Sequence, residues 1–104
     1  MSDYTDNLFP KISLPEALQL IGKADDAYEN EQFRKAIRFF SQALQAPLSD
    51  LDKGYILYMK GKAYLELGDM GRACEQWSKA IELDLTQHPL GIDLVSDAYK
   101  KYCG

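Results

Sequence analysis

Apolar side chains recur at three- and four-residue spacing in five separate stretches of this chain, which is the pattern of amphipathic helices. The pattern predicts helices at about residues 14–29, 33–46, 51–67, 70–83 and 89–103. Turn and cap residues separate them: Ser13 and Glu16 form a capping-box pattern, and Gly68-Asp69 is typical of a helix end followed by a new N-cap. Ser49 and Asp50 are alternative caps for the third helix. The sequence therefore predicts an all-α fold of five helices.

The chain also matches itself when it is shifted along its own length. Leu20, Leu57 and Leu94 lie 37 residues apart. A fixed period of this size is typical of stacked helical units that share one continuous core. We expect an α-solenoid made of two helical hairpins, repeat 1 at about residues 14–46 and repeat 2 at about 51–84. The last helix, at about 89–103, has no partner in a third hairpin and is expected to cap the apolar end of the stack.

Large, small and aromatic side chains follow a fixed order in each repeat. In the second repeat the order is carried by Leu57, Gly61, Tyr64, Gly68, Asp69, Ala73, Trp77 and Ala80. In the first repeat it is carried less fully by Leu20, Ala24, Tyr28, Phe33, Ala36, Phe40 and Ala43. This order resembles the tetratricopeptide repeat (TPR) family, and the resemblance implies a right-handed solenoid in which small residues let paired helices cross closely.

Two features depart from the usual pattern of that family. The period is three residues longer than usual, and the excess fits in the linker at residues 46–53. Leu85 stands where a proline often ends the second helix. Residues 1–12 carry no helical period and are predicted to be a flexible arm that docks through Leu8 and Phe9, whereas residues 13–104 are predicted to form a single TPR-like domain.

The resemblance further implies a concave groove lined by the first helix of each hairpin, which would bind a partner peptide or helix. By register, its residues are Leu18, Ile21, Asp25, Tyr28, Tyr55, Tyr58, Lys62, Leu65 and Tyr99, with Ile92 and Val95 as further candidates. Exposed apolar patches with tyrosines mark interaction sites. The sequence thus favours a non-catalytic adaptor. Two alternatives stay open: these side chains are core beneath the last helix, or the groove pairs two copies of the chain as a structural homodimer.

One activity known in the family is disfavoured by particular residues. Members that grip a C-terminal carboxylate use lysine, asparagine and arginine on successive first helices. The matching positions here hold Ile21, Asp25, Met59, Ile92 and Ser96. Since Asp25 would repel a carboxylate, we do not expect a carboxylate-clamp co-chaperone.

Charge and hydropathy narrow the range of partners. The 104 residues include 16 acidic and 12 basic side chains. The basic ones are scattered, unlike a nucleic-acid-binding surface, and Arg34, Lys35 and Arg38 are best explained as a solvated helix face. No apolar run approaches the roughly 18 residues of a membrane span. The N-terminal stretch carries Asp3 and Asp6 where a signal peptide needs positive charge. We expect a cytoplasmic protein whose partner is another protein, with neither nucleic acid nor membrane involved.

The sequence contains few residues that could act in catalysis or bind a metal. His88 is the single histidine, and it stands near no metal-spaced cluster and no candidate nucleophile. We therefore predict no enzymatic activity, no cofactor and no metal site. Cys74 is expected to face the last helix and Cys103 lies at the end of that helix, so the two cysteines can meet. A disulfide bond between them would stabilise the fold by roughly 3 kcal/mol. In a reducing cytoplasm two buried thiols are the expected state.

Overall fold

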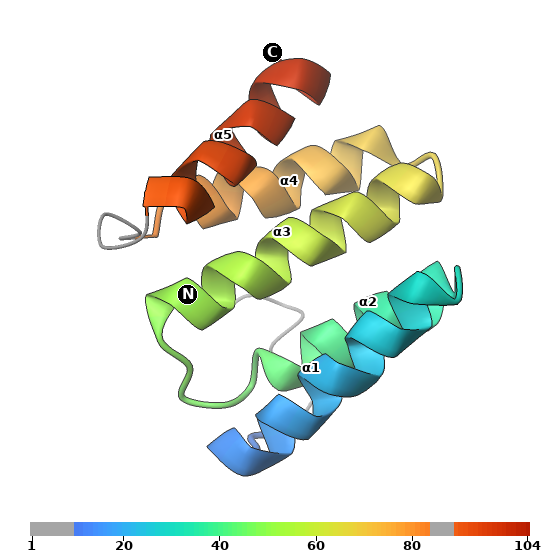
Figure 1. The fold of residues 1–104 in the computed structure, drawn as a ribbon, viewed down its shortest axis with the longest axis vertical. Helices are drawn as coiled ribbons and strands as arrows, with labels where there is room; N and C mark the ends of the chain where they lie inside the picture. The colour runs from blue at the N-terminus through green and yellow to red at the C-terminus, as the bar shows by residue number, and fades with distance from the viewer. Residues whose placement is uncertain (1–9, 84–88) are drawn as a thin grey trace. The chain divides into compact units, whose positions relative to one another are not determined.

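The computed structural model describes residues 10–83 and 89–104, without side-chain detail for 89–93, and within these residues it is all helical with no strand (Figure 1). The five helices are α1 (Leu14–Glu29), α2 (Phe33–Ala43), α3 (Asp50–Glu66), α4 (Met70–Ile81) and α5 (Pro89–Tyr102). The prediction of an all-α chain with five helices is confirmed. Most of the predicted arm, with Leu8 and Phe9, lies outside the described residues, as do Leu85 and His88.

The helices fall into two compact units, Met1–Leu48 and Ser49–Gly104. The first contains α1 packed on α2; the second contains α3 packed on α4, with α5 packed on α4 and to a lesser extent on α3. The boundary lies in the segment that the sequence predicts to be a linker. Each unit is described below on its own.

Helix starts follow the predicted caps. The Ser13 hydroxyl accepts from the Glu16 backbone N–H, and the Glu16 carboxylate accepts from the Ser13 backbone N–H, which is a complete capping box. Ser49 rather than Asp50 caps α3, through the Asp52 backbone N–H. As a result α3 begins and ends one residue earlier than expected. α2 and α4 end at Ala43 and Ile81, earlier than predicted.

The two hairpins turn in the same way. After α1, the Glu31 N–H donates to Tyr28 O and the Gln32 N–H donates to Ala27 O at 2.8 Å. After α3, Gly68 and Asp69 repeat this pattern, and the Asp69 N–H donates to Tyr64 O at 2.9 Å. Glu31 and Gly68 have φ of 60° and 79°. This pair of bonds around one left-handed residue is a Schellman motif, and it closes both helices at equivalent points of the repeat.

Small residues bring the paired helices together in each unit. In the first, Ala17 and Ala24 of α1 and Ala36 and Phe40 of α2 are fully buried. In the second, Ala73 and Trp77 of α4 are fully buried, and the indole lies against Gly61 of α3. Small residues let the two helices approach closely, and one large ring per hairpin fills the space that remains between them.

Several large apolar residues outside the predicted groove set are exposed. These residues are Leu14 (40% exposed), Leu51 (38%), Met70 (41%), Ile81 (46%) and Leu94 (54%).

Candidate functional site

The first set of candidate site residues lies along α1, on the side that α2 does not cover. Ala17, Ala24 and Ala27 turn to α2 and are buried. Leu18 is 56% exposed, and the other three predicted groove residues of this helix are half-buried. Those three are Ile21, Asp25 and Tyr28. In this unit the predicted residues therefore form a helix surface and not a core.

One aromatic contact fixes the end of this surface. The Tyr28 ring meets the Phe33 ring edge to face, with centroids 5.2 Å apart. Phe33 is the first residue of α2, so the contact spans the hairpin turn and restrains the Tyr28 side chain. An aromatic side chain that is already restrained loses little entropy when it binds a partner.

The second set lies on α3 and α5 in the second unit. Tyr55 is 43% exposed, and the remaining four predicted residues are half-buried. Those four are Tyr58, Lys62, Leu65 and Tyr99. The buried side of α3 is formed by other positions, among them Ile56 and Leu57. None of the nine predicted groove residues has the burial of a core residue, and Val95, the additional candidate on α5, is the one that is buried, at 3% exposure.

Tyr58 holds a central place in this second set. The Lys62 ammonium lies 5.5 Å from the centre of the Tyr58 ring, a cation–π distance. The backbone carbonyl of Tyr58 accepts a hydrogen bond from Trp77 Nε1 at 3.1 Å, which satisfies the buried indole. The backbone of Tyr58 therefore belongs to the core while its ring belongs to the surface.

Two exposed leucines extend the predicted set at equivalent positions. Leu14 precedes Leu18 by one turn on α1, and Leu51 precedes Tyr55 by one turn on α3. Neither leucine is among the groove residues predicted from the sequence. The signal that identifies them is the repeat itself, since Leu14 and Leu18 fall on Leu51 and Tyr55 when the chain is shifted by its period.

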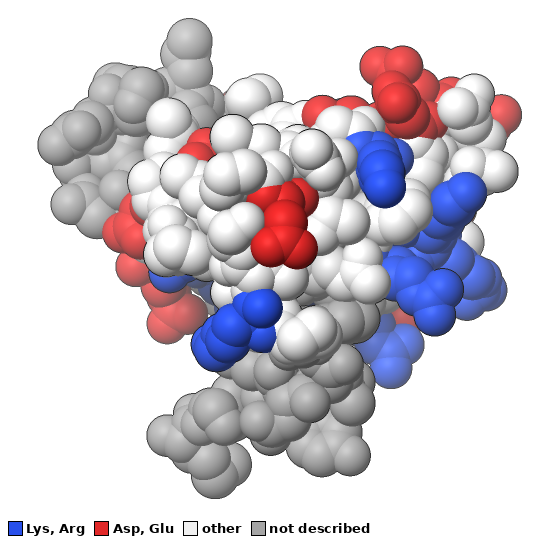
Figure 2. Space-filling model, turned by 90° about the horizontal axis from the view of Figure 1, so that it is seen from below, with Lys and Arg blue, Asp and Glu red and all other residues white. Residues whose placement is uncertain are grey.

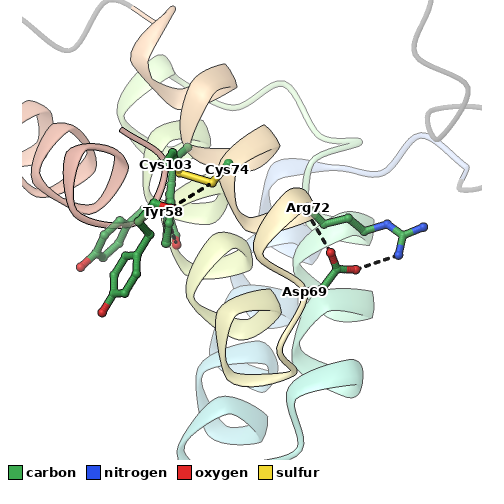
Figure 3. The surroundings of a disulfide bond; sticks show 7 residues. Tyr58, Asp69, Arg72, Cys74 and Cys103 are labelled. Atoms are coloured by element: carbon green, nitrogen blue, oxygen red, sulfur yellow. Dashed lines mark hydrogen bonds and ion pairs between the residues drawn. A yellow bond between two sulfur atoms is a disulfide. The ribbon is translucent and has the colours of Figure 1, made fainter.

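A small electrostatic cluster marks the turn between α3 and α4 (Figure 3). The Asp69 carboxylate accepts from the Arg72 backbone N–H at 3.1 Å and from its guanidinium at 2.9 Å. These bonds hold the pKa of Asp69 below its usual value and raise that of Arg72. Burial raises the pKa of Tyr64, partly opposed by the charge of Arg72. The cluster stabilises the start of α4 and contains no nucleophile.

Two further surface features are polar. Arg34, Lys35 and Arg38 of α2 are all exposed. On the face shown in Figure 2, basic and acidic side chains are both present among uncharged ones. A hollow of about 350 Å³ lies between α1 and α2. It is lined by Lys23, Asp26, Ala27, Asn30, Gln32, Lys35 and Phe39.

In the part of the chain that the structure describes, no three histidine, cysteine or acidic residues lie close enough together to hold a metal ion. Across the same residues, no helix is both long enough and apolar enough to cross a membrane.

The two cysteines differ from expectation. Cys74 of α4 and Cys103 at the end of α5 form a disulfide rather than two buried thiols, with Cα atoms 5.9 Å apart (Figure 3). The prediction that they meet is correct. Both residues are half-buried.

No protein-family model, curated protein or solved structure matches this chain.

Proposed function

We propose that this protein is a non-catalytic adaptor that binds a peptide or helix of another protein through the exposed side of α1 and α3. The observation that carries the proposal is that the same two positions of the repeat expose apolar side chains in each unit. They are occupied by Leu14 and Leu18 on α1 and by Leu51 and Tyr55 on α3. Large apolar side chains repeated on one helix face mark an interaction surface when no partner helix covers them.

The proposed architecture is a TPR-like, right-handed solenoid. It is supported by the shared 37-residue period, by the identical hydrogen-bond pattern of the two turns and by alanine-based packing within each hairpin. In solenoids of this kind the first helix of each hairpin contributes to the binding surface.

Each side chain has a distinct role in the proposed binding. Leu18 and Tyr55 supply apolar anchors, and Tyr58 and Tyr28 supply rings that are already restrained by their neighbours. Asp25 and Lys62 set the register of the ligand through charge. An extended or helical segment that alternates apolar and charged positions fits this surface best.

The test uses two serine variants and one matched control. Leu18→Ser and Tyr55→Ser remove exposed anchors, whereas Ile81→Ser removes an exposed apolar side chain of α4, a helix that contributes none of the predicted groove residues. Immobilised wild-type protein and the Ile81→Ser variant should retain the same partner from native lysate. Each anchor variant should weaken binding of that partner by on the order of 1–3 kcal/mol, with unchanged circular dichroism.

Light scattering over a range of concentrations separates the adaptor from a homodimer. A monomer that captures a partner supports the proposal. A dimer that Leu18→Ser or Tyr55→Ser dissociates would instead show that the surface pairs two copies of the chain. A cytoplasmic location remains a prediction.

A further inference from the structure

The second unit contains a covalent clamp at the end of its last helix. Cys103 lies one residue beyond α5, and its disulfide to Cys74 ties this end of the helix to the first half of α4. One turn of α4 separates Cys74 from Trp77. The bond therefore holds the end of α5 next to the largest buried side chain of the protein.

An aromatic contact lies beside the clamp. The Tyr102 ring stacks on the Trp77 indole, with centroids 5.7 Å apart and planes inclined by 29°. Trp77 itself has no exposed surface. The indole also meets Gly61 and donates its N–H to the Tyr58 carbonyl. Both the α3–α4 hairpin and the end of α5 therefore contact Trp77.

From Leu94 onward, few side chains of α5 are buried. Of its side chains described from Leu94 onward, only Val95 is buried. Ala98, Tyr99 and Tyr102 are half-buried, and Leu94 is 54% exposed. An isolated helix of this length is marginal in water, and a segment with few buried apolar contacts opens at low cost. From Leu94 onward, α5 is held by the disulfide, by the buried Val95 and by the stacking of Tyr102 on Trp77.

We propose that the Cys74–Cys103 disulfide is a reversible redox latch that holds α5 over Trp77, and that its reduction releases α5 and uncovers this face of α4. The co-reactant is a dithiol reductant. One of its thiolates attacks a sulfur of the bond, its second thiol closes the reductant's own disulfide, and two protons end on Cys74 and Cys103. The step transfers two electrons and conserves atoms.

The position of the bond fits this role. Both cysteines are half-buried rather than enclosed in a core, so a reductant can reach them. Cleavage frees the end of α5 without breaking any contact between α3 and α4. Closure of a loop of this length changes a docking equilibrium by about 100-fold or more.

The single tryptophan of the chain reports the state of the latch directly. In oxidised wild-type protein, Trp77 should emit at short wavelength and resist quenching by acrylamide. Addition of a dithiol should shift the emission to longer wavelength and raise the quenching constant several-fold, and reoxidation should reverse both changes. Circular dichroism should show loss of no more helix than α5 contributes.

Two variants complete the experiment. Cys74→Ser and Cys103→Ser should show the released spectrum without reductant and no response to it. If either variant does not fold, hydrogen exchange of the wild type with and without reductant replaces it, and only the amides of α5 and the face beneath it should lose protection. Unchanged quenching of Trp77 in fully reduced wild-type protein would overturn the proposal. Loss of helix throughout the chain on reduction would also overturn it, because the bond would then support the whole fold.

Discussion

The Trp77 indole lies directly against the Cα of Gly61, where α3 and α4 cross. A Cβ built on Gly61 would meet the Cδ1 and Cε2 atoms of the indole at 2.7 Å. Neither partner can yield easily, because the indole has no exposed surface and donates its N–H to the backbone of Tyr58. The glycine is therefore a requirement of the packing and not of the backbone conformation.

This contact predicts opposite effects for two glycine substitutions. Gly61→Ala should destabilise the second unit by about 1–3 kcal/mol, because the methyl group overfills the space beside Trp77. Gly22→Ala in α1 is the matched control, since nothing lies within 4 Å of the added Cβ. It should stabilise by about 0.5–1 kcal/mol through helix propensity. Urea unfolding measures both, and a Gly61→Ala protein as stable as wild type would contradict the packing described here.

The two hairpin turns predict a second pair of changes. Glu31 adopts a left-handed conformation that costs a side-chain-bearing residue roughly 1 kcal/mol, whereas Gly68 adopts it freely. Glu31→Gly should therefore raise the free energy of unfolding by up to about 1 kcal/mol, and Gly68→Ala should lower it by a similar amount. Thermal unfolding of the two variants beside wild type is the measurement. If both substitutions raised, or both lowered, the free energy of unfolding, the two turns would not be equivalent.

Asp69 predicts a dependence of stability on pH. Its pKa in the folded protein is lowered by the hydrogen bonds to Arg72, so its contribution is present above the ordinary carboxyl pKa of about 4. That contribution is lost as the pH falls through the lower, folded value. Asp69→Asn keeps an N-cap oxygen but does not titrate. Unfolding curves measured from pH 6 to pH 2 should show a smaller loss of stability in the variant than in the wild type. An equal loss in both proteins would show that Asp69 does not cause the pH dependence.

The stacking of Tyr102 on Trp77 predicts a difference between two substitutions that leave the disulfide intact. Tyr102→Ala removes the ring and should destabilise the docking of α5 by about 0.5–1.5 kcal/mol beyond the lost burial. Tyr102→Phe keeps the ring and should have little effect. Acrylamide quenching of Trp77 distinguishes them, and equal quenching in both variants would show that the ring does not protect the indole.

Much of this fold could be predicted from the sequence because its signals are local. The Ser13 capping box, the Gly68-Asp69 turn and the start of α1 depend on neighbours within a few residues, and all appear as expected. The gap between the first two predicted helices indicates a turn at Glu31 but not its left-handed conformation. That conformation is set by the Schellman hydrogen bonds and not by the preference of glutamate.

The candidate site could be predicted less fully because exposure depends on packing across the chain. Periodicity marks an apolar stripe but does not say where the partner helix stops, so it could not show that Leu14 and Leu51 are exposed. The disulfide was missed as the favoured state because the expectation rested on the compartment rather than on the geometry of α4 and α5.

Hydroxyl-radical footprinting of the complex with the captured partner tests most directly whether the partner binds the exposed side of α1 and α3, because leucine and tyrosine side chains are oxidised according to their exposure. If it binds there, oxidation of Leu18, Tyr55 and Tyr58 should fall several-fold in the complex, while oxidation of Ile81 and Met70 should not change. If instead Ile81 and Met70 were protected and Leu18 and Tyr55 were still oxidised, the partner would bind α4, which would contradict the proposed binding surface.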